Sequence, residues 1–380
     1  MSSAQVIIVG TIRSTLIVML VTALGAPAQT ALEQAVQFAR EQRYAEARKA
    51  LQSASEPGGT PQRIAYHRLK AAIASGLGDA VSAAEEMRVA LALAPADSGL
   101  QMAAAAAELQ AGRLDDALAH ARGGSGTAVG QALLGDIFEK RGEYVEAVKA
   151  YQTAVTLAPE NEQYRIALAL ELVQHLTFEP AIAVLEQAEP LFPKSARIRT
   201  LLGVARYAAE RYAEAESALT EAIEIAPDLE PAYGYLAQVA LDSPAVPAEK
   251  SLKAICARKA EACSVLKYRS ARQNGDAAGQ TQAVAELKRA PEDSTVARCE
   301  LGKIYQAGGR WTEARVELEA CVRLDDSPQN HYRLGLVYGR LGLGEQARKE
   351  MELRKAAEDR KSEETARRQN AVQAFRYLMK

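Results

Sequence analysis

Large apolar residues recur three or four places apart along most of the chain, and these stripes predict short amphipathic helices. The stretch GQALLGDIFEKRGEYVEAVKAYQTAVTLAP at 130–159 holds two such stripes, separated by a glycine that is followed two places later by a tyrosine. The glycine predicts a turn, and the closing proline predicts the end of the second helix. The pattern therefore predicts a helix, a turn and a second helix.

A similar stretch, IRTLLGVARYAAERYAEAESALTEAIEIAP, returns at 198–227, an offset of 68 residues or twice 34. Small residues at the eighth, twentieth and twenty-seventh places of each unit allow two helices to approach closely, while large residues fill the remaining space. In the unit that begins at 128 the recurring places hold Leu134, Gly135, Phe138, Gly142, Tyr144, Ala147, Tyr151, Ala154 and Pro159. A single helix pair cannot bury its own apolar face, so we expect neighbouring pairs to stack.

The repeat predicts an all-α fold, a right-handed α-solenoid of about eight to ten stacked helix-turn-helix units. The glycine-rich stretch GGSGT at 123–127 interrupts the period, and we expect it to be either a bend in the array or a solvated loop. The last segment is either a capping helix or a docking helix for a partner or a second copy. The expected blocks are a signal peptide (1–28), degenerate repeats (29–122), central repeats (128–242), an irregular helical repeat (243–294), C-terminal repeats (295–355) and a capping helix (356–380).

These units resemble the tetratricopeptide repeat family, in particular its exported bacterial members, and the resemblance covers most of the chain after residue 28. The resemblance implies an inner groove, lined mainly by the second, fifth, ninth and twelfth places of each first helix, that takes an amphipathic helix or an extended peptide. The family's clamp for chaperone tails is not implied, because its lysine and asparagine places hold Ala132, Asp136, Ala167 and Thr200. The groove residues expected here are Ile166, Leu170, Val173, Arg197, Val204, Tyr207 and Tyr235.

No catalytic or cofactor motif is found in the sequence, so we expect a protein that is not an enzyme and holds no cofactor or metal. The four histidines, His67, His120, His175 and His331, are more than 50 residues apart, and we expect them to be helix-surface or interhelix residues. A formal charge of −2 disfavours nucleic acid as the main partner, because binding phosphates requires a concentrated basic face.

The first 28 residues have the order of a secretory signal peptide. Arg13 precedes an apolar run at 14–25, and Ala26-Pro27-Ala28 then offers a small-x-small cleavage site. The alternative is an uncleaved membrane anchor that starts at Val6. We therefore expect an exported protein, either periplasmic or secreted.

Four cysteines lie late in the chain, and their even number permits two disulfides in an exported protein. Cys256 and Cys263 flank an expected turn, and Cys299 and Cys321 lie at similar heights on two helices of one unit. This placement favours the pairs 256–263 and 299–321, with buried free thiols as the alternative.

Taken together, these patterns predict a scaffold or assembly factor that binds a partner protein in its groove. One alternative is a permanent architectural subunit of an envelope or secretion complex, associated with a membrane and able to form homo-oligomers through the C-terminal helix. A less favoured one is the regulatory repeat region of an enzyme.

Overall fold

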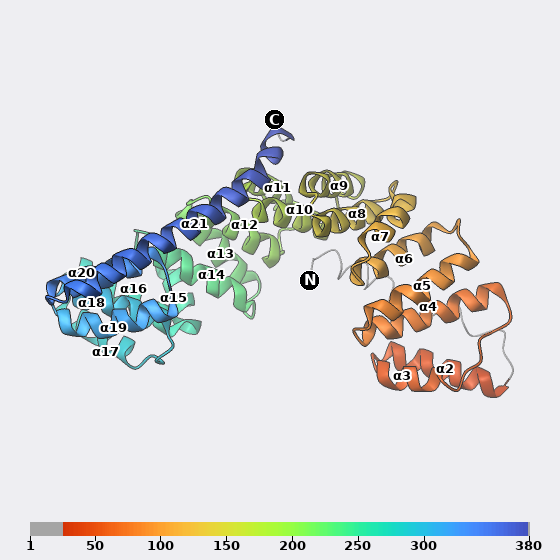
Figure 1. The fold of residues 1–380 in the computed structure, drawn as a ribbon, viewed down its shortest axis with the longest axis horizontal. Coiled ribbons are helices and arrows are strands. Elements are labelled where there is room, and N and C mark those ends of the chain that lie inside the picture. Colours follow the sequence, from red (N-terminus) through yellow and green to blue (C-terminus); the bar gives the residue numbers. More distant parts are fainter. Residues whose placement is uncertain (1–25, 379–380) are drawn as a thin grey trace. The chain divides into compact units, whose positions relative to one another are not determined.

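The computed structural model describes residues 26–378, and within that range the chain forms twenty α-helices and no strand. The all-α repeat fold expected from the sequence is thereby confirmed (Figure 1). The chain divides into two compact units, with unit 1 ending at Leu172 and unit 2 beginning at Val173. This boundary falls inside the block 128–242 that the sequence predicts as one array.

Unit 1 contains the first helix pairs. Its first helix includes residues 26–28 of the expected signal peptide, and the rest of that segment lies outside the described residues. The helices are α2 (Ala26–Arg40), α3 (Tyr44–Leu51), α4 (Thr60–Gly76), α5 (Ala80–Leu93), α6 (Ser98–Gln110), α7 (Leu114–Ala121), the 3-10 helix η1 (Arg122–Gly124), α8 (Ala128–Arg141), α9 (Tyr144–Leu157) and most of α10 (Glu162–Gln174).

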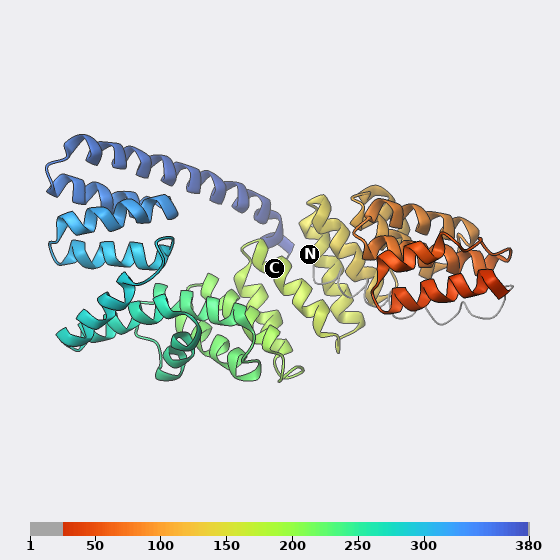
Figure 2. The ribbon, with the colours of Figure 1, turned by 90° about the horizontal axis from the view of Figure 1, so that it is seen from below.

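Unit 2 contains the later helix pairs, and Figure 2 shows its last helices, coloured cyan to blue, lying side by side in layers. The helices are α11 (Phe178–Ala188), α12 (Ala196–Ala208), α13 (Tyr212–Ile225), α14 (Glu230–Asp242), α15 (Glu249–Arg258), α16 (Ala260–Gln273), α17 (Ala277–Lys288), α18 (Thr295–Ala307), α19 (Trp311–Leu324), α20 (Pro328–Arg340) and α21 (Gly344–Leu378).

The turn within most pairs contains one residue in the left-handed backbone conformation. The predicted turn at Gly142 has φ 75°, and the equivalent glycine of a later unit, Gly309, has φ 70°. Glycine adopts this conformation without the clash that a Cβ produces. In other pairs Gln42, Leu176 and Glu210 occupy the same place with φ of 56° to 60°.

Several first helices begin with a short polar side chain that accepts a hydrogen bond from a free backbone N–H. Asp97, Ser195 and Ser294 do so at the starts of α6, α12 and α18, with distances of 3.0, 3.1 and 3.3 Å. Capping of this kind satisfies donors that the helix itself leaves unpaired. It also fixes where each first helix starts.

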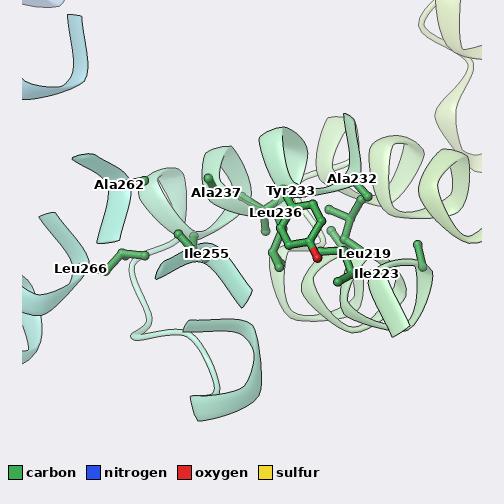
Figure 3. Close-up of a cluster of buried hydrophobic side chains, with 13 residues drawn as sticks. Leu219, Ile223, Ala232, Tyr233, Leu236, Ala237, Ile255, Ala262 and Leu266 are labelled. Atoms are coloured by element: carbon green, nitrogen blue, oxygen red, sulfur yellow. The ribbon is translucent and has the colours of Figure 1, made fainter. Parts of the chain in front are cut away.

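The hydrophobic core runs from each pair into the next. In unit 2 one cluster joins Leu219 of α13, Leu236 of α14, Ile255 of α15 and Leu266 of α16 (Figure 3). Because four successive helices contribute to one cluster, neighbouring pairs bury the apolar faces that a single pair would expose.

The GGSGT stretch is mostly exposed, as expected for a solvated loop, but it is anchored at one residue. Gly124 is buried at the end of η1, and the Thr127 hydroxyl donates to its carbonyl oxygen at 2.8 Å, whereas the other four residues are exposed. Leu109 of α6 and Leu133 of α8 belong to one core cluster, and both lie within unit 1. The helices on either side of this exposed turn therefore pack into one core.

Two block boundaries also differ from the expected ones. The segment expected to be one irregular repeat at 243–294 contains α15, α16 and α17. Of these, α15 is the second helix of one pair, and α16 and α17 form the next pair. The expected capping helix at 356–380 is, as far as Leu378, the continuation of α21, the 35-residue second helix of the last pair, and residues 379–380 lie outside the described residues.

Candidate partner-binding surface

Apart from Val173 at the end of α10, the predicted groove residues of unit 2 lie on α12 and α14. Arg197 is exposed and Val204 is partly exposed on α12. On α14 the Tyr235 side chain is 42% exposed, which leaves a large aromatic ring available to a partner. These two helices therefore present a mixed face with one prominent aromatic side chain.

Tyr207 is held more tightly than the sequence suggests. Its ring packs at the edge of the α13–α16 core cluster, and its centroid lies 6.1 Å from that of Tyr212. Its hydroxyl donates to the carboxylate of Asp242, which also accepts from Gln238 Nε2 at 2.7 Å. Burial, followed by the interaction with Asp242, raises the pKa of Tyr207 to about 12. The predicted apolar strip is therefore polar at this point.

Ile166 does not belong to an accessible surface. Its side chain is 1% exposed on α10, so it is part of the hydrophobic core and a partner cannot contact it. Leu170 and Val173, on the same helix, are partly buried. The helical period gives the direction of a side chain but not the depth of the packing around it, which explains the incorrect expectation for Ile166.

Two candidate contact residues on α20 were not anticipated from the sequence. Tyr332 is 43% exposed and Leu336 is 41% exposed. Arg354 of α21 lies over the Tyr332 ring, with its guanidinium carbon 5.6 Å from the centroid. These residues occupy the fifth and ninth places of the last unit, which begins at 328, so applying the groove positions to that unit would have found them.

Two histidines join the helices of their own pairs. His67 of α4 contacts Glu86 of α5 at 2.6 Å, and His331 of α20 contacts Glu350 of α21 at the same distance. Both pairs are separated by 19 residues and occupy equivalent places. Among the described residues, no group of three or more metal-ligating side chains could hold an ion.

The cysteines form two bridges in the structure, in the pairing that the sequence favours. The Cys256–Cys263 bridge spans the junction between α15 and α16, and the Cys299–Cys321 bridge joins α18 to α19. No cysteine of the described residues is free. One bridge therefore links the α14–α15 pair to the α16–α17 pair, and the other links the two helices of the α18–α19 pair.

These features define an all-α protein built from stacked helix pairs. Residues 140–222 match the family described as anaphase-promoting complex, cyclosome, subunit 3. No curated protein matches the sequence. Within residues 26–378, no helix combines the length and apolar character needed to cross a bilayer.

Parts of the chain are similar to solved structures of other proteins. The C-terminal part of a tetratricopeptide repeat protein from Cytophaga hutchinsonii is 17% identical, over 67% of this chain and 94% of that one, with a TM-score of 0.46. YrrB, described as having an unusual peptide-binding site, is 20% identical over 49% and 95%, with a TM-score of 0.37. The Cut9–Hcn1 complex of the anaphase-promoting complex gives 14% identity over 97% and 67%, with a TM-score of 0.41.

Proposed function

We propose that this chain is a non-enzymatic scaffold or assembly factor that binds a protein partner through the first helices of unit 2. The observation that carries the proposal is the exposure of Tyr235, Tyr332 and Leu336, each more than 40% exposed on a first helix. Exposed aromatic and aliphatic side chains on a rigid helix are typical anchors at protein interfaces.

The partner surface that fits these anchors is an amphipathic helix or an extended peptide with apolar side chains. Arg197, Val204 and Tyr207 remain the predicted contacts on α12. Because Tyr207 also packs against the core, its replacement would alter stability as well as binding. Replacing Tyr235 tests binding with a smaller effect on stability, because its side chain is exposed.

The test begins with mass spectrometry of proteins that co-purify with the tagged chain, followed by binding measurements with the purified partner. Tyr235→Ala and Tyr332→Ala are each expected to weaken binding by about 1–3 kcal/mol, the usual range for an anchoring aromatic. The matched control is Val316→Ala, an exposed apolar residue on the second helix α19. Unchanged affinity in both tyrosine variants would contradict the proposal.

A second candidate function is that of a permanent architectural subunit of an envelope or secretion complex. It is favoured by α21, whose 35 residues continue beyond the helices on which it packs (Figure 2). Purification from native membranes distinguishes the two functions. A fixed stoichiometric complex would support the architectural subunit, whereas exchange of the partner would support the scaffold.

We further propose that the protein is exported. The proposal is supported by the order of Arg13, the apolar run and Ala26-Pro27-Ala28, and by the two cysteine pairs at bonding distance. N-terminal sequencing of the mature protein should begin at Gln29. An intact Met1 on protein from the cytosol would contradict export.

A further inference from the structure

A cleft of about 490 Å³ opens between α16, α17 and α18 in unit 2. It exists because α17 fills little space: only Ala283 and Leu287 of its 12 residues are buried. Ala277, Ala278 and Ala285 of the same helix are exposed, and Ala285 lines the cleft. The volume lies within the range of ligand-binding pockets.

The cleft combines an aromatic floor with a basic rim. Tyr305 of α18 is buried beneath it, and Tyr268 of α16 lines one wall. Lys288 Nζ lies 5.6 Å from the centroid of the Tyr305 ring, and the guanidinium carbon of Arg310 lies 4.4 Å from it. Arg272 of α16 supplies the third cation, and none of the residues that line the cleft is acidic.

Among the described residues, the three cations have one acidic neighbour, Glu313. Arg310 donates to Glu313 at 3.0 and 2.8 Å, and this hydrogen bond and the charge of Lys288 both lower the pKa of that carboxyl. Arg272 makes no hydrogen bond or ion pair with a described acidic side chain. Three cations beside one carboxylate leave the cleft with a net positive charge next to an apolar and aromatic interior.

The surface continues past Arg272 into a second cleft of about 370 Å³. Arg272 lines both clefts, and the second one is formed by the loop Pro244–Pro247 together with Leu266 and Arg269. Val246 of that loop is 42% exposed. Two clefts that share a basic side chain fit an extended segment better than a compact small molecule.

We propose that these clefts bind an acidic peptide segment of a protein partner, with side-chain carboxylates on Arg272 and Lys288 and an apolar side chain over Tyr268. This proposal rests on the proposed function, because it assigns a chemistry to the partner. A guanidinium can hold a carboxylate through two parallel hydrogen bonds, which makes Arg272 the central contact.

The charge pattern excludes the chain's own ends as occupants. Residues 1–28 and 366–380 contain no aspartate or glutamate, and both segments carry arginine. Nucleic acid fits less well than an acidic peptide, because a polyphosphate backbone needs an extended basic track and the two clefts together offer four cations, one of them beside Glu300.

The test uses the full chain and two fluorescein-labelled peptides, one repeating Ser-Glu-Glu-Leu and the other repeating Ser-Gln-Gln-Leu, in a fluorescence anisotropy titration. The Glu peptide is expected to bind and the Gln peptide to bind at least roughly tenfold more weakly. The double change Arg272→Gln/Lys288→Gln should weaken binding of the Glu peptide by roughly tenfold, because it removes two exposed ion pairs of about 0.7 kcal/mol each.

The matched control is Arg289→Gln, which removes an exposed base next to Lys288 that does not line either cleft. The affinity of this variant for the Glu peptide should remain within about twofold of the affinity of the unchanged chain. Circular dichroism of each variant verifies that the helices persist. An equal loss in the control would assign the binding to general surface charge and overturn the proposal.

Two further outcomes would also overturn the acidic-segment proposal. The first is that the Gln peptide binds as tightly as the Glu peptide. The second is that a single-stranded oligonucleotide binds more tightly than the Glu peptide and that the double change abolishes this binding. The failure of the acidic-segment proposal can be distinguished from the failure of the proposed function. If the Glu peptide does not bind but Tyr235→Ala still weakens binding of the purified partner, only the acidic-segment proposal is contradicted.

Discussion

At the scale of single residues, Gly130 shows how closely the backbone packs in unit 1. A Cβ on Gly130 would overlap the carbonyl oxygen of Gly124, which is backbone and cannot swing aside. Gly130→Ala is therefore expected to lower the free energy of unfolding by about 1–3 kcal/mol, the usual cost of overpacking. Urea denaturation measures this. Gly126→Ala is the control, because a Cβ there meets no atom within 4 Å, and an equal loss in both variants would contradict the close approach.

Glu210 pays a conformational cost that the glycines in equivalent turns avoid. Its φ of 60° lies in the left-handed region, which costs a residue with a Cβ about 1–2 kcal/mol. Glycine relieves this cost but loses about 0.4–1 kcal/mol through the greater freedom of the unfolded chain. The net expectation for Glu210→Gly is a gain in stability of about 0.5–1 kcal/mol. A lower melting temperature than that of Glu210→Ala would contradict this reasoning.

At the scale of elements, His331 joins α20 to α21. Its Nδ1 contacts Glu350 at 2.6 Å and its Nε2 contacts Asp326 at 2.5 Å, while Arg360 also binds Asp326. Burial lowers the pKa of His331, but the hydrogen bonds and charges of Glu350 and Asp326 together outweigh this effect and raise its pKa. The protonated imidazole is therefore the form that stabilises this contact.

The sign of the pH dependence follows from that raised pKa. The stabilisation is complete below the unfolded value of about 6.5 and is lost as pH rises through the higher folded pKa. Urea denaturation of the unchanged chain and of His331→Gln, compared at several pH values, measures the difference. The advantage of the histidine should shrink as the solution becomes more alkaline. An advantage that grows with pH would contradict this assignment.

The element pattern was predictable where one residue type satisfies one local requirement. Gly142 marked a turn because the left-handed conformation suits glycine, and Gly135 marked a close helix approach because a Cβ there would meet the ring of Tyr151. The same turn conformation at Leu176 and Glu210 carries no such signal in the sequence. These turns were located by the 34-residue period alone.

The candidate surface was less predictable than the helices. Tyr235 is exposed, as a partner contact must be, whereas Ile166 is buried, because burial depends on neighbours that the helical period does not specify. Tyr332 could have been found by applying the same repeat positions to the last unit. The cleft beside α17 was not, because a void arises from three helices packing together and not from one residue pattern.

At the scale of the whole molecule, the two bridges stabilise segments of different length. Cys299 and Cys321 are separated by 22 residues, whereas Cys256 and Cys263 are separated by 7. Closing the longer loop removes more entropy from the unfolded chain, so the expected stabilisation is about 3 kcal/mol against about 2 kcal/mol. Thermal unfolding of Cys299→Ala/Cys321→Ala should therefore show the larger loss. Four freely alkylated thiols in native material would contradict both bridges.

The central claim is that a protein partner contacts the first helices of unit 2. The most direct measurement is photo-cross-linking in cells, with a benzophenone amino acid introduced at Tyr235 or, in a separate variant, at Val316. Both positions are exposed, but Tyr235 lies on a first helix and Val316 on a second one. We predict a discrete cross-linked partner from position 235 and none from position 316. Cross-linking from position 316 alone, or equal cross-linking from both, would contradict the claim.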